Sequence, residues 1–468
     1  MSGFETTTHL LFLLVAALFV VGLHLMNSPL SARAGNLLSA GAMAVAGVTT
    51  VAVLAHDDVI KTRGVVVLAA GLLLGSAAGA WGGRAVALTD MPQLVSLFNA
   101  AGGGAAALIA FAEVGNRAGH VEAFTAVGVA AALDVALGVL TFSGSLVAAG
   151  KLQGVISGNP VVFRGSRLLT AVTAAVLLGA GLVLVGWGGG TALLTVMGVA
   201  ALVLGVAMVM PIGGADMPVV ISLLNACTGV AVAMTGFMLD SVLLITAGAL
   251  VGASGSILTR LMAVAMNRSL IRIMAGGFGT DGGPVTGGGA AGVRSVAADD
   301  VAIQLAYASR VVIVPGYGLA AAHAQHEIAA LADQLTRNGV EVLYAIHPVA
   351  GRMPGHMNVL LAEANVPYDV MRDLDESNVA LPTADVALVV GANDVTNPAA
   401  RRKGSSIYGM PILDVDRARS VVVIKRSMGH GYAGIENELY ANSRTGMLFA
   451  DAKAGLAQIA AALKELVR

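Results

Sequence analysis

Asp216-Met-Pro-Val-Val-Ile-Ser-Leu-Leu-Asn225 is an apolar stretch that nevertheless carries a carboxylate, a hydroxyl and an amide. Asp90-Met-Pro-Gln-Leu-Val-Ser-Leu-Phe-Asn99 repeats it upstream, with Asp, Pro, Ser and Asn at the same offsets. A proline two residues after the aspartate suits the first turn of a helix, where its missing N–H costs nothing. Each copy therefore predicts a helix in which Asn follows Asp by about 13.5 Å, at a rise of about 1.5 Å per residue.

The repeat places Asn99 and Asn225 at matched depth. If each aspartate marks a membrane surface, each asparagine lies near the middle of a hydrocarbon layer about 30 Å thick. An unpaired amide is costly there, so the two amides indicate a polar pathway or a hydrogen bond between helices. A purely structural role, in which they only tie helices together, stays open. Asn99, Asn225 and Asp216 are the candidate residues of this pathway.

The composition is that of a membrane protein with a soluble part. Hydrophobic residues make up 56% of the chain and charged residues 12%, whereas soluble proteins contain about 25% charged residues. Charges become denser after Asp299, which predicts a membrane domain followed by a soluble one. The net charge of -1 offers no basic patch for nucleic acid. The single cysteine, Cys227, excludes an intrachain disulfide, and we expect no metal site.

Nine apolar runs are long enough to span a membrane. They cover residues 7–26, 35–55, 63–82, 92–113, 121–149, 168–189, 191–212, 218–239 and 241–264. Their many Gly and Ala residues allow close approach of helices. The first run has neither a basic segment before it nor an Ala-x-Ala site, which predicts a retained helix rather than a cleaved signal.

Lysine and arginine in the short loops predict the orientation, because they collect on the cytoplasmic side. One set of sides holds Arg33, Arg84, Lys151, Arg164, Arg167, Arg260, Arg268 and Arg272, and the other holds Lys61, Arg63 and Arg117. The first set is predicted to be cytoplasmic, together with the C-terminal portion, and the N-terminus is predicted to lie outside. Both Asp-Met-Pro copies then begin at the cytoplasmic face and run in the same direction, as a parallel repeat.

Asp134 is a further ionisable residue within a predicted helix. It is a functional candidate or one member of a buried structural pair. The histidines of this half fall near helix ends or in loops: His9, His24, His56 and His120. Because histidine is the side chain that titrates near neutral pH, the predicted helix centres hold no proton carrier of this kind.

Ala275 to Val293 is too rich in glycine for a packed element and predicts a flexible tether. The predicted domains are a transmembrane domain over 1–273, a linker over 274–298 and an α/β domain over 299–468.

The segment beyond the tether alternates helices and strands. A helix over 299–309 precedes the strand Arg310-Val-Val-Ile-Val314, and Gly316-Tyr-Gly318-Leu-Ala-Ala321 leads into a helix that ends near residue 338. Strand, turn, helix and strand are the context in which Gly-x-Gly-x-x-Ala cradles a phosphate, although ordinary tight turns share the pattern. Six strands, at 310–314, 341–346, 367–371, 385–391, 411–415 and 420–424, predict a doubly wound, Rossmann-like sheet.

The predicted strand ends favour one dinucleotide over the other. The second strand runs into His347 without the acidic residue that would bind a ribose 2′-hydroxyl, which disfavours NAD. The last strand runs into Lys425, Arg426 and Ser427, two cations and a hydroxyl that suit a 2′-phosphate. A solvated basic turn is the alternative. Asp394 follows the fourth strand and points to the same crevice, or else caps a helix.

Longer motifs resemble the β subunit of the proton-translocating NAD(P) transhydrogenase, over essentially the whole chain. They are Thr89-Asp-Met-Pro92, Gly150-Lys-Leu-Gln-Gly154, Gly213-Gly-Ala-Asp-Met-Pro218 to Asn225, Val314-Pro-Gly-Tyr-Gly318, Ile346-His-Pro-Val-Ala-Gly-Arg-Met-Pro-Gly-His-Met-Asn358, Val366-Pro-Tyr-Asp369, Gly391-Ala-Asn-Asp394, Asn397-Pro398, Lys425-Arg-Ser-Met428, Gly431-Tyr-Ala-Gly434 and Asp451-Ala-Lys453. The resemblance implies a Re/Si-specific transhydrogenase in which hydride passes from NADH to NADP⁺ as protons enter the cell. It makes 1–273 a proton-channel domain and 299–468 an NADP(H)-binding, Rossmann-like domain.

The resemblance also implies roles for single residues. Asp394 would lie beside the nicotinamide and couple protonation to NADP(H) occupancy, and Asn225 corresponds to the family's membrane asparagine. The implied cofactor-binding residues are Gly316, Tyr317, Gly318, Ala321, His347, Val349, Ala350, Gly351, Arg352, Gly391, Ala392, Asn393, Asp394, Lys425, Arg426, Ser427, Gly431, Tyr432, Ala433 and Asp451. Of these, Gly316 to Gly318 would approach the pyrophosphate and Lys425 to Ser427 the 2′-phosphate.

The resemblance implies partner subunits. Some family members carry a proton-relaying histidine where this chain has Asn99, and an amide cannot be protonated at ordinary pH. The relay histidine would then belong to a separate or fused membrane segment of an α subunit, which also binds NAD(H). The whole complex is expected to be a dimer in the cytoplasmic membrane.

Two other functions are compatible with parts of the sequence. One is a secondary transporter or channel with a regulatory cytoplasmic nucleotide-binding domain, and the other is a membrane-anchored NADP-dependent reductase. A regulator needs no selectivity for a 2′-phosphate, which Lys425 to Ser427 suggest. A reductase needs a substrate domain, and none is visible between 299 and 468.

Overall fold

A computed structural model describes residues 3–466. The exceptions are 27, 29–30, 57–61, 88–89, 118, 159, 214–215, 267–268, 271–272, 274–292, 352–354, 406, 430, 432 and 434. The chain forms two compact units, Met1–Pro211 with Val220–Thr259, and Ile212–Val219 with Arg260–Arg468. Most of the predicted linker, 274–292, lies outside the described residues.

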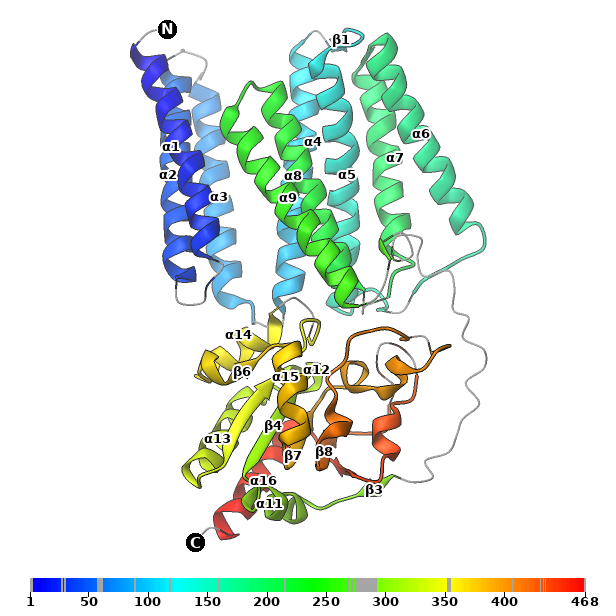
Figure 1. The fold of residues 1–468 in the computed structure, drawn as a ribbon. Helices are drawn as coiled ribbons and strands as arrows, with labels where there is room; N and C mark the ends of the chain where they lie inside the picture. Colours follow the sequence, from blue (N-terminus) through cyan, green and yellow to red (C-terminus); the bar gives the residue numbers. More distant parts are fainter. Residues whose placement is uncertain are drawn as a thin grey trace. The chain divides into compact units, whose positions relative to one another are not determined.

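Among the described residues, nine helices are long and apolar enough to cross a membrane (Figure 1). They are α1 (Gly3–Leu25), α2 (Ala32–His56), α3 (Thr62–Ala85), α4 (Met91–Asn116), α5 (Ala126–Leu152), α6 (Ser166–Trp187), α7 (Thr191–Val209), α8 (Met217–Met238) and α9 (Val242–Ala265). Each predicted apolar run coincides with one of them. Pro92 and Pro218 lie in the first turns of α4 and α8, as the repeated Asp-Met-Pro motif predicts.

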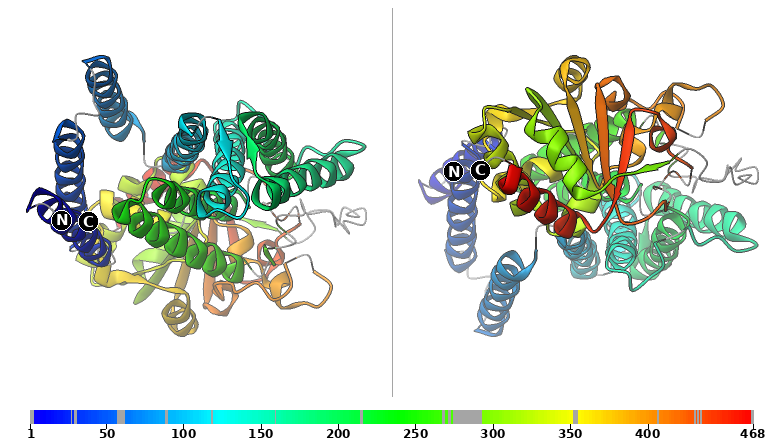
Figure 2. Two further views of the ribbon diagram at one scale, coloured as in Figure 1. Left: turned by 90° about the horizontal axis from the view of Figure 1, so that it is seen from above. Right: turned by 90° about the horizontal axis from the view of Figure 1, so that it is seen from below.

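Glycine allows the helices to pack backbone to backbone. A Cβ atom on Gly138 of α5 would lie 2.6 Å from the carbonyl oxygen of Gly103 on α4. A Cβ atom on Gly229 of α8 would lie 2.3 Å from the backbone nitrogen of Gly252 on α9. Seen end-on in Figure 2, α4, α5 and α7 lie side by side. The small residues therefore place side chains of different helices within hydrogen-bonding reach.

The second unit contains a parallel sheet of seven strands in the order β3-β9-β8-β7-β4-β5-β6. The strands are β3 (Arg294–Ser295), β4 (Arg310–Pro315), β5 (Glu341–Ala345), β6 (Met371–Arg372), β7 (Val386–Val390), β8 (Ser420–Lys425) and β9 (Thr445–Phe449). From β4 the chain moves outward to β5 and β6, and it then continues on the other side through β7, β8 and β9. This order is typical of doubly wound sheets, which bind ligands outside the carboxyl ends of their strands.

Both faces of the sheet are covered, because successive strand residues point to opposite faces. Val311 and Ile313 of β4 join one hydrophobic cluster with helices α11 (Ala298–Ala306), α13 (Gln325–Arg337) and α16 (Ala452–Leu466). Val312 and Val314 join a second cluster on the other face. Figures 1 and 2 show α13 and α16 together against the sheet. The remaining helices are α12 (Tyr317–Ala321), α14 (His356–Glu363) and α15 (Leu374–Ala380).

Three predicted elements of this unit were wrong. Residues 411–415 form no strand, because the Leu413 N–H donates to the Val395 carbonyl at 2.9 Å and not to a strand of the sheet. The helix expected to run from the Gly-x-Gly turn to residue 338 is broken at His323, whose φ of 49° is left-handed. The strand expected at 367–371 is reduced to β6, while β3 and β9 were not predicted.

Candidate functional site

The carboxyl ends of β4, β7 and β8 bring three predicted segments to one edge of the sheet. Gly316 follows β4, Gly391 follows β7 and Lys425 ends β8. The three strands are neighbours in the sheet and run in parallel, so their loops emerge together. The candidate site is built on this edge, at the point where the strand order reverses.

Gly316, Gly318 and Gly391 are required by backbone contact between two loops. A Cβ atom on Gly316 would lie 2.4 Å from Ala392 Cα, and one on Gly318 would lie 2.6 Å from Gly391 Cα. The Gly316 N–H donates to the Val390 carbonyl, and the Gly318 N–H to the Gly391 carbonyl, each at 2.9 Å. Gly391 also has a φ of 71°. The Gly-x-Gly turn is therefore held directly on the loop that carries Asp394.

Asp394 is the first residue of a 3-10 turn, Asp394–Thr396, whose N-cap position is Asn393. The Oδ2 atom of Asp394 accepts a hydrogen bond from the Ala433 N–H at 2.9 Å. Gly431 lies so close that a Cβ atom there would meet Asp394 Oδ1 at 2.3 Å. The carboxylate thus joins the β7 loop to the loop that contains Gly431 and Ala433.

Lys425 is held between the same two loops. Its ammonium donates to the Gly429 carbonyl and lies 4.7 Å from the centre of the Tyr440 ring. The Asn393 amide, oriented with its oxygen toward these donors, accepts from Lys425 Nζ at 3.2 Å and from the Gly431 N–H at 2.6 Å. Burial lowers the pKa of Lys425, and the charge of Asp394 opposes that shift. The ammonium of Lys425 therefore already contacts protein groups on several sides.

Arg426 and Ser427 are the exposed members of the basic cluster. Arg426 forms no hydrogen bond or ion pair with any residue that the structure describes. The hydroxyl of Ser427 accepts only a long hydrogen bond, 3.4 Å, from the Gly429 N–H. The guanidinium and the hydroxyl at the end of β8 are accordingly available to an anionic ligand.

His347 orders the loop that follows β5. Its Nδ1 accepts from the Val349 N–H at 3.2 Å, so the proton lies on Nε2, which donates to the Pro411 carbonyl at 2.8 Å. Burial lowers the pKa of this imidazole to about 4. The ring is neutral and both nitrogens are used inside the protein. Ala350 is buried, and Gly351, with a φ of 103°, leaves no room for a side chain beside His356.

The structure spreads the other predicted residues more widely. Tyr317 and Ala321 begin and end α12, and Ala321 is exposed. Asp451 accepts at 3.0 Å from the Lys453 N–H in the first turn of α16. Arg352 and Tyr432 lie outside the described residues.

Asn437 and Tyr440 belong to the site although they were not predicted. Asn437 donates to the Asn393 carbonyl at 2.9 Å, and the Tyr440 hydroxyl lies 2.9 Å from the Asn393 amide. Burial raises the pKa of Tyr440, so its hydroxyl stays protonated. Asn437 also caps a 3-10 turn, a preference that the sequence could have indicated. No spacing pattern identifies Tyr440.

In the helical unit the two repeated asparagines are not equivalent. Asn99 is buried and donates from Nδ2 to the Ile221 carbonyl of α8 at 3.2 Å. Thr228 of α8 donates to the Asn99 carbonyl at 3.4 Å. The side chain of Asn225 is half-buried and forms no hydrogen bond with the described residues. The α4 asparagine therefore links two helices, whereas the α8 asparagine makes no such link to any residue in the described part of the chain.

The two repeated aspartates also differ. Asp90 is partly exposed and accepts from the Gln93 side chain at 3.1 Å, one turn into α4. Asp216 precedes α8 and is buried. No group of histidine, cysteine and carboxylate side chains among the described residues could hold a metal ion.

The arrangement is that of an integral membrane protein whose helices precede a parallel α/β domain with a basic, glycine-lined strand edge. Comparison with known proteins gives the family. The chain matches the family described as NAD(P) transhydrogenase beta subunit over residues 8–462, and it belongs to that family. Two relatives from Rhodospirillum rubrum, each named NAD(P) transhydrogenase subunit beta, are 48% identical over 463 residues, 97% of this chain and 98% of theirs.

Proposed function

We propose that this chain binds NADP(H) at the carboxyl ends of β4, β7 and β8, as one subunit of a proton-translocating NAD(P) transhydrogenase. The observation that carries the proposal is the exposed Arg426 and Ser427 at the end of β8. A guanidinium that has no ion-pair partner among the described residues, together with a hydroxyl, fits a phosphate monoester. The edge of the sheet on which they lie is where doubly wound domains bind dinucleotides.

The remaining residues of the site fit the same ligand. In the turn that follows β4, Gly318 is partly exposed and has no side chain, so the turn can lie close to a pyrophosphate. Bound NADP⁺ supplies the carbon that accepts a hydride. Asp394 lies between the β7 loop and the Gly431 loop, so its charge state would bear on how firmly that loop closes over the ligand. This connection is a route by which protonation and nucleotide occupancy can be coupled.

The partners follow from the name of the relatives and from what this chain lacks. A subunit named beta has an alpha partner. The described residues hold one sheet of the dinucleotide-binding kind, so we assign the NAD(H) site to that partner. We also assign to its membrane segment the histidine that this chain lacks at Asn99. Hydride would pass from NADH to NADP⁺ while protons move inward, in a dimeric complex whose α/β domains face the cytoplasm.

Nucleotide titration of the purified full-length chain tests the proposal. NADP(H) should bind, and NAD(H) should bind far more weakly. Arg426→Ala should weaken NADP(H) binding by about 1.5–3 kcal/mol, the value of a hydrogen bond to a charged group, and it should leave NAD(H) binding unchanged. Arg444→Ala is the matched control. Arg444 directly precedes β9, so it lies at the amino ends of the strands, opposite the carboxyl ends that form the site. Equal affinity for both nucleotides, or equal effects of both variants, would contradict the proposal.

A further inference from the structure

Asp134 is a fully buried carboxyl group in the helical unit. It is the ninth residue of α5, about 12 Å along the helix from Ala126 at about 1.5 Å per residue. Its Oδ2 atom accepts from the Thr235 hydroxyl of α8 at 2.7 Å. Its Oδ1 atom is also buried and has no hydrogen-bond partner among the described residues. In the nine described helices it is the one carboxyl more than a turn from a helix end.

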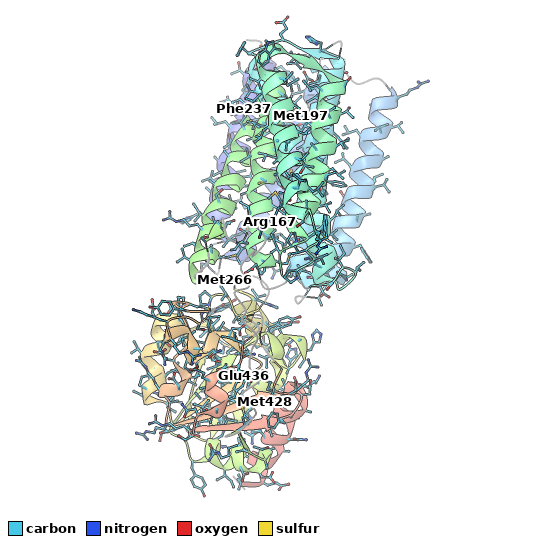
Figure 3. The ribbon with its side chains drawn as sticks, turned by 90° about the vertical axis from the view of Figure 1, so that its right-hand side faces the viewer. Arg167, Met197, Phe237, Met266, Met428 and Glu436 are labelled. Carbon is cyan, nitrogen blue, oxygen red and sulfur yellow. The ribbon has the colours of Figure 1, made fainter. Side chains whose placement is uncertain are left out.

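The helices around Asp134 offer it no positive charge. α7 and α8 contain no charged residue, and the titratable side chain of α8 is Cys227. The charged residue of α4 is Glu113, which pairs with Arg117. Lys151 lies in the last turn of α5 and donates to the Met210 carbonyl. Phe237 of α8 lies two residues after Thr235 and is near one end of the helices (Figure 3). Arg167 of α6 lies farther toward the other end.

A carboxylate ion in this position would lie in an apolar medium with one hydroxyl donor and no counter-ion. Such a charge is far more costly than the neutral acid. The neutral acid instead has an O–H group at Oδ1 that needs an acceptor. The geometry therefore fits a carboxyl group that carries a proton and can pass it on.

Further oxygens extend from Asp134 along the same face of α5. Gly138, Thr141 and Ser145 follow at steps of four, three and four residues, which keeps them on one helix face. Thr141 Oγ1 and Ser145 Oγ are buried and have no partner among the described residues. Ser96 Oγ, one turn before Asn99 on α4, is in the same state. Buried polar atoms of this kind are typical of sites that hold ordered water.

We propose that Asp134 is a proton-binding relay group of this chain, connected along α5 by water and the hydroxyls of Thr141 and Ser145 toward the level of Asn99. The proposal rests on the proposed function, because the proton it carries is the one that the complex translocates. On uptake, an O–H bond forms at Asp134 as one breaks in a hydronium ion supplied by water. On release, the proton returns to water, and no electron is transferred.

Infrared difference spectroscopy of the reconstituted complex tests the protonation state without reference to turnover. The wild type should show the carbonyl band of a protonated carboxyl group, which shifts in D₂O. Asp134→Asn should abolish the band, and Thr235→Val should move it to higher frequency by removing the hydrogen bond at Oδ2. Absence of any band that depends on Asp134 would overturn the proposal even if the complex is an active transhydrogenase.

Proton-coupled hydride transfer in liposomes tests the relay role. Asp134→Asn keeps the size and the acceptor for Thr235, so we expect folding and NADP(H) binding to persist while coupled turnover falls by about a hundredfold, a typical loss for a proton-transfer group. Asp134→Glu should restore much of it. Full coupled turnover in Asp134→Asn would overturn the relay. If the wild type does not bind NADP(H), the proposed function is wrong. The infrared measurement does not depend on that function, so the two failures can be told apart.

Discussion

Asp394 of the α/β unit lies among donors, whereas Asp134 of the helical unit lies among apolar helices. Asp394 accepts from the backbone N–H of Ala433 and lies near the ammonium of Lys425. Asp134 has one hydroxyl neighbour, and no charged side chain of the described helices α7 and α8 faces it. Both carboxyl groups are assigned a role in proton coupling. The surroundings of Asp394 favour the ionised carboxylate, whereas those of Asp134 favour the neutral acid.

The difference follows from how each architecture uses its backbone. Loops at the ends of strands leave N–H groups free to turn toward a carboxylate, as the Gly431 to Ala433 segment does. Helices within a membrane use nearly all of theirs internally. A carboxyl group among helices must therefore find a side-chain partner or keep its proton. Glycine serves both units, but it joins loops in one and whole helices in the other.

The largest effect should come from the contact between the Gly-x-Gly turn and the β7 loop. Gly391→Ala adds a Cβ atom 2.4 Å from Gly318 Cα at a φ of 71°. We expect a loss of about 2–5 kcal/mol of unfolding free energy, from left-handed strain and overpacking together. Denaturation of a fragment over residues 290–468, which we expect to fold alone, measures it.

Gly339→Ala is the control for that substitution. Gly339 has a φ of 82° with nothing within 4 Å of the added Cβ atom. It should show the backbone strain alone, about 1–2 kcal/mol. Equal losses in the two variants would mean that the contact between the loops is unimportant, and an unfolded wild-type fragment would contradict its independence.

His347 should make the α/β domain sensitive to acid. Its folded pKa of about 4 lies below the usual value of 6.5, so the unfolded chain takes up the proton first as the pH falls. The stability that it contributes is complete above pH 6.5 and should be lost toward pH 4, by about 3 kcal/mol. His347→Gln should flatten this pH profile, whereas His326→Gln, at an exposed position, should leave it unchanged. If the loss of stability toward pH 4 persists in His347→Gln, a group other than His347 causes it.

The smallest change in stability should come from the two membrane asparagines. Asn99→Leu removes one hydrogen bond between α4 and α8, worth about 0.6 kcal/mol in membranes, and Asn225→Leu removes none between described residues. Both should slow proton-coupled turnover, because they remove polar groups from the proposed pathway, and both should leave nucleotide binding intact. Reconstituted proton transport measures this. If both variants keep full proton-coupled turnover, the two amides have only a structural role.

The helical unit was the easier of the two to predict from sequence. Each apolar run corresponds to one helix, and Pro92 and Pro218 each mark the first turn of one helix. The local sequence pattern is therefore enough to predict these helices. In the α/β unit, the apolar run 411–415 satisfied the same local pattern but lies outside the sheet, while β9 was overlooked. Local pattern could not distinguish them, because strand pairing is decided by distant partners.

The candidate site shows the same limit. Strand ends correctly brought Gly316, Asp394 and Lys425 to one edge of the sheet. The bonds that hold them were not predictable, since Asn437 and Tyr440 are more than 40 residues from the Asn393 loop that they contact. The equivalence of Asn99 and Asn225 in the repeat also fails in three dimensions, because, among the residues that the structure describes, Asn99 donates to a carbonyl of a neighbouring helix and Asn225 does not.

The central claim is that this chain supplies the NADP(H) site and part of the proton path, while a partner supplies NAD(H). Hydride transfer from NADH to an NADP⁺ analogue, followed in liposomes with and without the α subunit, tests it most directly. The chain alone should bind NADP(H) and transfer no hydride. Adding the NAD(H)-binding partner should restore hydride exchange, and proton movement should require its membrane segment as well. NADH-driven proton transport by the lone chain would contradict the account.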